Sequence, residues 1–171
     1  NSDGSNDLLL TNEIYLPEGY VELSFDRFFT AGYGHTFHIL ISLDNWNTSN
    51  ITNMEYVFYG AGSFNGNISS WDVSNVKRMQ SMFQSCQFNN DISSWNTSNV
   101  NYMENMFAGA ETFDQNLNSW DVSNVLNMSR MFVNADAFNS DISSWDTSNV
   151  TDMSNMFYGA DSFNQDIGNW N

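Results

Sequence analysis

Tryptophan recurs at an almost constant interval through most of this 171-residue chain. Intervals of 25, 24, 25, 25 and 25 residues separate the six tryptophans, from Trp46 to Trp170. A fixed period of this length is the signature of structural repeats that stack on one another. We therefore predict an N-terminal segment at residues 1–45, then five tandem repeats at residues 46–70, 71–94, 95–119, 120–144 and 145–169, and the start of a sixth strand up to residue 171.

Nearly every large apolar side chain keeps the same place in successive repeats, and we call each shared place a column. All nine methionines fall in two columns, and phenylalanine fills two more. Another column holds isoleucine or leucine, three residues before each tryptophan from Trp71 onward. One shared structural role per column explains this regularity, so we expect the columns to form a continuous core.

Each repeat also carries a helix-like apolar pattern. In the fifth repeat Val150, Met153, Phe157 and Ala160 are three, four and three residues apart. This spacing is that of the apolar stripe of a short helix. Gly159 and its counterparts in the other repeats are Gly, Ser or Asn, and Gly and Asn suit the left-handed conformation that ends a helix. The pattern therefore predicts one short helix per repeat.

The segment around each tryptophan is predicted to be a short strand. Trp145 and Thr147 are two residues apart, the period at which side chains share one face of a strand. A strand and a helix within 25 residues match the plan of leucine-rich repeats. We therefore expect an α/β solenoid, a right-handed, leucine-rich-repeat-like stack of one short strand plus one short helix per repeat. Residues 1–45 lack the repeat and are expected to form a β-rich N-terminal cap.

Acidic residues dominate the charge of the chain. Twenty Asp and Glu against four Lys and Arg give a formal net charge of −16. Nucleic acids and anionic membrane surfaces are bound by basic patches, so we expect neither as a partner. No stretch reaches the roughly 18 consecutive apolar residues of a membrane-spanning helix, so we expect no membrane insertion. The surface must consist largely of Asn, Ser, Asp and Thr, which is typical of an exported protein.

The repeat W-[DN]-[TV]-S-N-[VI]-x-x-M-x-x-[MV]-F, followed by F-[ND]-x-[ND]-[IL]-x-x-W, resembles a known tandem repeat. It is similar to that of BspA-like leucine-rich-repeat bacterial surface proteins, which is also abundant in mycoplasma surface lipoproteins. The resemblance covers residues 46–171 and leaves residues 1–45 outside it. It implies an extracellular or cell-surface location and, loosely, adhesion. It implies no defined ligand.

Two functions from different classes follow. The first is an adhesion or binding module for a protein or glycan ligand, which would lie on the outward polar side chains of the strands. The second is a structural subunit of an extracellular filament, a homopolymer joined head-to-tail through the N-terminal cap and the uncapped last repeat. The binding face of the first hypothesis comprises Asp72, Ser74, Asn96, Ser98, Asp121, Ser123, Asp146 and Ser148.

No motif in the chain predicts an enzyme, a cofactor or a metal site. There is no nucleophile elbow, phosphate-binding loop or zinc-ligand spacing. Columns of Asp and Asn leave calcium open as an alternative, although neither column has the spacing of a calcium loop. The tryptophan column is expected in the core, with an exposed platform for glycans as the alternative. Six N-x-[ST] sequons mark possible glycosylation, at Asn47, Asn50, Asn67, Asn96, Asn127 and Asn149.

Overall fold

The computed structural model describes residues 20–25, 37–42 and 46–170. Two strands, β1 (Tyr20–Phe25) and β2 (Phe37–Ser42), pair antiparallel in a two-stranded sheet. In this register Tyr20 lies opposite Ser42, and Phe25 lies opposite Phe37. Both strands belong to the predicted N-terminal cap. Most of that segment lies outside the described residues, so its role as a cap stays a prediction.

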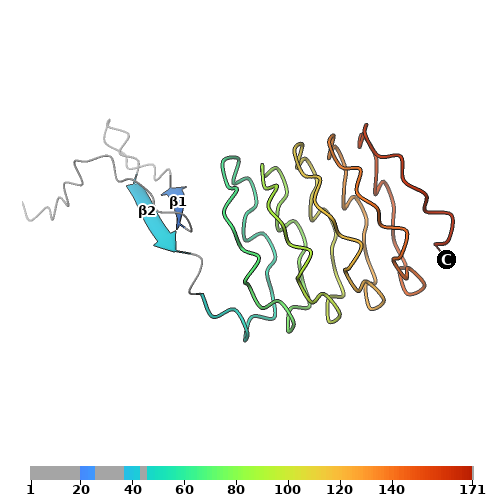
Figure 1. The fold of residues 1–171 in the computed structure, drawn as a ribbon, viewed down its shortest axis with the longest axis horizontal. Helices are drawn as coiled ribbons and strands as arrows, with labels where there is room; N and C mark the ends of the chain where they lie inside the picture. The colour runs from blue at the N-terminus through green and yellow to red at the C-terminus, as the bar shows by residue number, and fades with distance from the viewer. Residues whose placement is uncertain (1–19, 26–36, 43–45, 171) are drawn as a thin grey trace, which may run out of the picture.

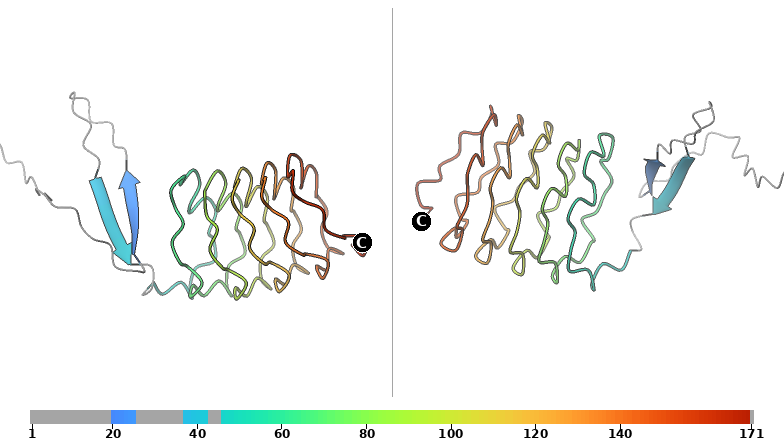
Figure 2. Two further views of the ribbon diagram at one scale, coloured as in Figure 1. Left: turned by 45° about the horizontal axis from the view of Figure 1, so that its top comes forward. Right: turned by 180° about the vertical axis from the view of Figure 1, so that it is seen from behind.

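Residues 46–170 form a stack of coils, with one coil for each repeat (Figures 1 and 2). Neighbouring coils run parallel to one another. A row of isolated parallel bridges crosses the whole stack, and it joins Asn53, Arg78, Tyr102, Asn127 and Asp152 in turn. Residues at the same place in successive repeats therefore lie side by side, and each column of the sequence is a row of neighbours in space.

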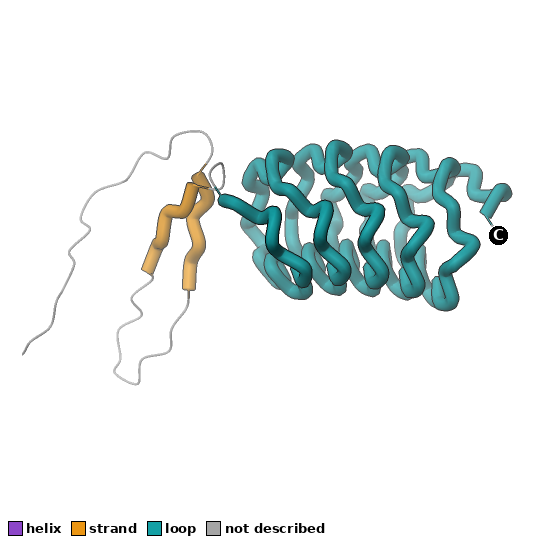
Figure 3. The backbone as a smooth tube through the Cα atoms, turned by 90° about the horizontal axis from the view of Figure 1, so that it is seen from below, coloured by secondary structure: helices purple, strands orange, loops and turns teal. Residues whose placement is uncertain are grey.

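The predicted α/β solenoid is wrong, because the described repeats contain neither a helix nor a strand (Figure 3). The leucine-rich-repeat plan is not supported either. In the segment predicted to be helical, alternate N–H groups bond to the next coil. The N–H groups of Asn105 and Phe107 donate to the carbonyls of Ser129 and Met131, at 3.1 and 2.9 Å. A helix needs these N–H groups to bond four residues back along the chain, so this pattern excludes one.

The helix-like spacing has a different cause, which is a series of tight turns. The N–H of Met106 bonds back to the carbonyl of Met103 at 3.2 Å, and that of Ala110 bonds to Phe107 at 3.0 Å. The next turn follows directly, because the N–H of Phe113 bonds to the carbonyl of Ala110 at 3.1 Å. All five side chains are fully buried. Each turn directs its first and fourth residues inward, and this produces a three-residue spacing like that of a helix face.

The predicted strand around each tryptophan is also replaced by turns. The N–H of Trp145 bonds to the carbonyl of Ile142 at 3.2 Å, and that of Val150 bonds to Thr147 at 2.9 Å. The inward direction predicted for Trp145 and Thr147 is nevertheless correct, since both are buried. In the described part of the chain, no helix is long and apolar enough to cross a membrane.

Two columns in every coil adopt a left-handed backbone conformation. The φ angles of these columns lie between 52° and 71°, although most of the residues are not glycine. The left-handed turns let the backbone reverse its direction within two or three residues, so that alternate N–H groups face the next coil. The first column holds Tyr56, Ser81, Asn105, Arg130 and Asn155, and the second holds Gly60, Ser85, Gly109, Asn134 and Gly159.

The second left-handed column gives a direct test of this backbone. Replacing Gly60 by Ala should lower the free energy of unfolding by roughly 1–2 kcal/mol, the cost of a left-handed conformation with a Cβ atom. No atom lies within 4 Å of the added Cβ, so the loss comes from the backbone alone. The matched change Ser85→Gly, at φ 54°, should stabilise the protein. Urea unfolding measures both, and a loss of stability in Ser85→Gly would contradict the assigned conformation.

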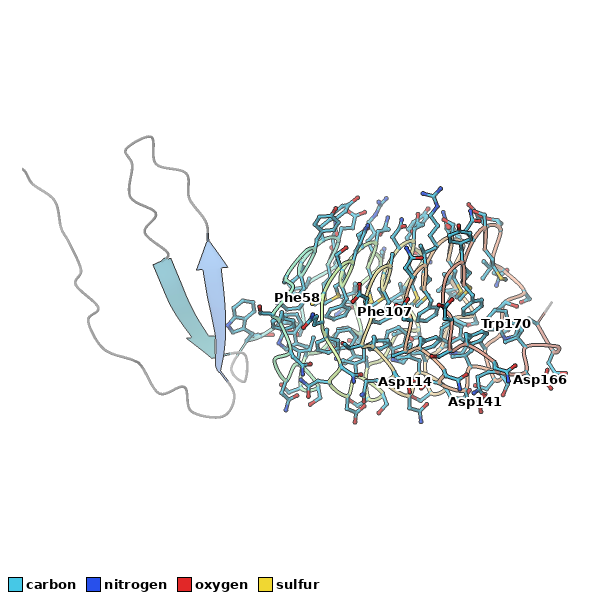
Figure 4. The ribbon with its side chains drawn as sticks, turned by 90° about the horizontal axis from the view of Figure 1, so that it is seen from above. Phe58, Phe107, Asp114, Asp141, Asp166 and Trp170 are labelled. Carbon is cyan, nitrogen blue, oxygen red and sulfur yellow. The ribbon has the colours of Figure 1, made fainter. Side chains whose placement is uncertain are left out.

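Aromatic rings fill the interior of the stack (Figure 4). Phe107 stacks on Phe83 and Phe132 of the neighbouring coils, with ring centroids 5.5 and 5.6 Å apart. The tryptophans from Trp95 onward also donate from the indole Nε1 to a carbonyl 27 or 28 residues earlier in the chain. The bond from Trp120 to Ile92 O, for example, is 3.1 Å long. The tryptophans from Trp71 to Trp145 are buried, which places this column in the core rather than on an exposed platform.

Candidate functional site

The surface of the stack has a hollow whose shape follows from one column. This column lies directly before the second left-handed column. Its side chains become smaller from Tyr158, which is 70% exposed, through Val133 to Ala108, which is 6% exposed. They become larger again at Gln84. The result is a shallow depression across the second to fifth coils, which we call the trough. Its lining includes Gln84, Ser85, Asn105, Ala108, Gly109, Arg130, Val133, Asn134, Asn155 and Tyr158.

Left-handed residues form the two sides of the trough. Asn105, Arg130 and Asn155 come from the first left-handed column, and Ser85 and Asn134 come from the second. A left-handed residue directs its side chain away from the path of its neighbours. Polar groups therefore stand on both sides of a floor made of small or apolar residues.

The polar side chains of the trough have no partners within the described part of the protein. Gln84, Asn105, Arg130, Asn134 and Asn155 make no side-chain hydrogen bond or ion pair with any described residue. Amide groups offer both donors and acceptors, and a guanidinium offers donors only. These groups are free to bind a ligand, and they surround one depression. Some side chains outside the trough, such as Glu111 and Asp161, also have no side-chain hydrogen bond to a described residue.

Elsewhere, surface amides and carboxylates connect one coil to the next. The side-chain oxygens of Asn65, Asn89 and Asp114 accept backbone N–H groups of the following coil, at 2.8–3.0 Å. The Nδ2 groups of Asn99 and Asn149 donate to serine carbonyls of the preceding coil, both at 2.7 Å. Such ladders stabilise the stack, and their groups are already occupied.

The residues predicted to form a polar binding face lie in turns rather than on a strand. The side-chain oxygens of Asp72, Asn96, Asp121 and Asp146 each accept the N–H of the serine two residues later, at 3.0–3.2 Å. The serines are Ser74, Ser98, Ser123 and Ser148. These oxygens hold the backbone in tight turns, as Asp and Asn commonly do. Whether the same face also binds a ligand stays a prediction.

A second depression lies beside the trough and is acidic. Glu55, Gln80, Glu104 and Asp152 line it, and it shares Arg130 with the trough. Burial, followed by the nearby charges of Glu55 and Asp152, raises the pKa of Glu104 above its ordinary value. The Oε1 atom of Gln80 and the Oε2 atom of Glu104 are buried without a hydrogen-bond partner.

Calcium binding gains no support from this second depression. Within the residues that the structure describes, no group of three or more His, Cys, Asp or Glu side chains has the arrangement to hold a metal ion. One carboxylate of the depression is already paired, since Arg78 Nη1 lies 3.3 Å from Glu55 Oε1. Calcium usually takes six to eight oxygen ligands, which this depression does not assemble.

Charge is distributed unevenly around the coils. The described basic residues are Lys77, Arg78 and Arg130, and all three come from the segment that carries the bridges and the first left-handed column. Carboxylates without basic neighbours follow another edge, where Asp114, Asp141 and Asp166 are labelled in Figure 4. The trough contains Arg130 and no carboxylate, although the chain has a net charge of −16.

The six sequons differ in the state of their amide groups. The Nδ2 of Asn127 donates to Glu104 Oε1 at 3.1 Å, and that of Asn149 donates to Ser123 O at 2.7 Å. Asn47, Asn67 and Asn96 are exposed, and each uses only its Oδ1 in a turn. Glycosylation stays a prediction. Asn50 is also exposed and makes no side-chain hydrogen bond with a described residue, so these four asparagines offer free amide nitrogens.

The aspartates that accept hydrogen bonds from serine in tight turns predict that the stability of the fold is sensitive to acid. Hydrogen bonds from serine hold the pKa of Asp72, Asp91, Asp141 and Asp146 below the ordinary value of 3.8. A lowered pKa in the folded state stabilises the protein above the unfolded pKa, and this stability is lost as the pH falls below it. We therefore expect the melting temperature to decrease as the pH falls below about 4.

The matched variant replaces these four aspartates by asparagine, which already occupies the same columns in other repeats, as at Asn67 and Asn96. Asparagine keeps the acceptor oxygen but does not ionise, so the decrease at acid pH should become smaller. Thermal unfolding between pH 7 and 3 measures both proteins. An unchanged decrease in the variant would assign the acid sensitivity to other carboxylates.

Sequence reasoning missed the trough because it treated each column as uniform. The signal was present in the columns that vary. One column changes from Tyr to Gln, Ala, Val and Tyr along the five repeats, and the first left-handed column changes from Tyr to Ser, Asn, Arg and Asn. A position whose residue type changes between otherwise regular repeats is a candidate for a role other than packing.

A protein-family comparison finds one family whose model matches the chain. The family is described as a mycoplasma protein of unknown function, DUF285, and its model matches residues 26–138 and 87–171. These matches cover all the repeats. They support the mycoplasma part of the resemblance found in the sequence but do not single out BspA-like leucine-rich repeats. No curated protein and no solved structure matches the chain.

Proposed function

The chain belongs to the DUF285 family of mycoplasma proteins of unknown function, and we propose that it is an extracellular, cell-surface binding module whose ligand lies in the trough. The observation that carries the proposal is the set of unpartnered polar groups that surround the trough, on a surface where many other amides and carboxylates connect one coil to the next. The surface location rests on the polar composition and on the finer resemblance to BspA-like surface proteins.

A rigid repeat stack suits this role. Backbone bonds between coils and buried aromatic stacks hold each trough residue in place, so little conformational entropy is lost when a ligand binds. The trough spans several coils, so a ligand can contact several repeats at once.

Filling the trough tests the proposal. Ala108→Trp places a large ring on the trough floor and should abolish binding to the probes that the unaltered chain captures from glycan and peptide arrays. The matched control Ala137→Trp makes the same change outside the trough and should leave binding unchanged. Capture of no probe, or equal capture by Ala108→Trp and the unaltered chain, would contradict a binding role for the trough.

A second candidate, a subunit of a head-to-tail filament, is favoured by the backbone groups at the two ends of the stack. In the last coil the N–H groups of Met153, Asn155 and Phe157 have no backbone acceptor among the described residues. Their counterparts in earlier coils donate to the next coil. In the first coil the carbonyls of Glu55 and Val57 accept no such bond from a described residue. The end of one copy therefore offers the donors that the start of another copy needs.

Light scattering over a range of protein concentrations tests this assembly. Val57 is 46% exposed at the first coil, so Val57→Lys should block the contact. Leu126→Lys is the matched control, because Leu126 is 38% exposed in the fourth repeat, away from that end. A monomer at every concentration, or an assembly weakened only by Leu126→Lys, would exclude this candidate.

A further inference from the structure

The chemistry of the trough selects a class of ligand. We propose that the trough binds an acidic sugar, a pyranose ring that carries a carboxylate, with the carboxylate on Arg130 and the ring against Tyr158. This inference rests on the proposed binding function and adds the chemical class of the ligand. It follows from three features of the trough, namely its charge, its aromatic wall and its shallow floor.

Arg130 is the charged group of the trough. Its side chain is exposed and forms no ion pair with any described carboxylate, and no Asp or Glu lines the trough. Arg130 also lines the acidic second depression, where hydrogen bonds from Ser154 and then the charge of Arg130 lower the pKa of Asp152. Arg130 is nevertheless the charged side chain that faces the trough. A planar guanidinium binds a carboxylate through two parallel N–H···O bonds, which gives both affinity and orientation. The general field of the chain repels anions, so a bound anion needs such a specific contact.

The ring of Tyr158 and the trough amides match the rest of a sugar. Tyr158 is 70% exposed and forms one wall of the trough. An aromatic face suits the C–H face of a pyranose, and Tyr keeps a polar hydroxyl at its edge. Asn134, Asn155 and Gln84 offer amide donors and acceptors that fit sugar hydroxyls.

The floor of the trough favours a flat ring over a peptide. Ala108, Gly109 and Val133 form a shallow, mostly apolar surface. Peptide recognition depends on pockets that receive individual side chains or on an exposed strand edge that pairs with the peptide backbone. In this stack the backbone groups between coils bond to one another, and the floor has no deep pocket. A sugar ring needs neither feature.

Isothermal titration calorimetry with sialyllactose, a glucuronic acid disaccharide and neutral lactose tests the inference. The two acidic probes should bind at least tenfold more tightly than lactose, and added salt should reduce this preference because it screens the charge pair. Arg130→Gln should remove the preference, and Arg130→Lys should restore part of it. Arg78→Gln is the matched control, because Arg78 pairs with Glu55 outside the trough. Tyr158→Ala should weaken the binding of every sugar.

The outcomes separate this inference from the proposed function. Equal binding of acidic and neutral sugars, no binding of any sugar, or no effect of Arg130→Gln would overturn the acidic sugar. If an array probe of another class still loses its binding in Ala108→Trp, the trough remains a binding site and only the ligand class is wrong. If Ala108→Trp affects no probe, both proposals fail. Unfolding curves must show that each variant keeps its fold.

Discussion

Replacing Phe107 by alanine should lower the free energy of unfolding by about 3–5 kcal/mol, the range found for buried phenylalanines. The ring of Phe107 is fully buried at the middle of the stack. It stacks on Phe83 and Phe132 in the adjacent coils and on Phe113 in its own coil, with centroid distances of 5.5, 5.6 and 4.0 Å. Alanine would leave a cavity that two coils must share, and the rigid bonds between coils limit its collapse.

Urea unfolding followed by tryptophan fluorescence measures this loss. The control is Phe163→Ala in the last repeat, where the side chain is only partly buried and stacks on a neighbouring coil at one side. Its loss should be clearly smaller. A loss of less than about 1 kcal/mol for Phe107→Ala would mean that the phenylalanine columns do not form the core.

Deleting Glu104 should be more damaging still, with an expected loss above about 4 kcal/mol or complete unfolding. Glu104 lies between Met103 and Met106, in the segment where inward side chains and left-handed residues follow a fixed order. Removing one residue shifts every later side chain of this segment by one place. Apolar side chains then face water, and alternate N–H groups face away from the next coil.

The matched control is the deletion of Thr112. Repeat two already lacks a residue at this place, between Gln87 and Phe88, and Phe88 is still fully buried. Thr112 is exposed, and its hydroxyl makes one weak bond of 3.4 Å to Gln87 O. Its deletion should cost less than about 1 kcal/mol. Circular dichroism and thermal unfolding compare the two deletions, and equal losses would contradict the assigned register.

The pH sensitivity and the glycine test both depend on tight turns, although on different turns of the coil. Asp72 and Asp146 stabilise their turns by accepting a hydrogen bond from the serine N–H two residues later, and Gly60 allows its turn because glycine readily adopts a left-handed conformation. Both features could be located in the sequence, since Asp, Asn and Gly recur at fixed places. Their conformations could not. Asn and Gly suit a helix end and a tight turn equally well, so residue type alone did not choose between them.

The candidate site was the least predictable part. The alternation of Asp72 and Ser74 with buried residues predicts an outward binding face, but in the structure the N–H of Ser74 donates to Asp72 Oδ1. The trough residues belong to columns whose residue type differs between repeats, so the repeat pattern does not indicate them. They include Arg130, Asn134 and Tyr158. These residues line one depression because adjacent coils stack, which brings residues about one repeat apart in the sequence into contact.

The period, the division into coils and the inward direction of the apolar columns can all be derived from the order of the residues. Burial depends mainly on whether a side chain is apolar, and the regular positions of the apolar residues can be read directly from the sequence. The backbone conformation depends on contacts between coils, which the order of the residues does not reveal. The N–H of Phe107 had two possible acceptors, a carbonyl four residues back in a helix or Met131 in the next coil. Both choices place the same side chains inward, so the pattern could not distinguish them. The neighbouring coil favours the second conformation, because it supplies the carbonyl acceptor and because its Phe132 stacks on the ring of Phe107.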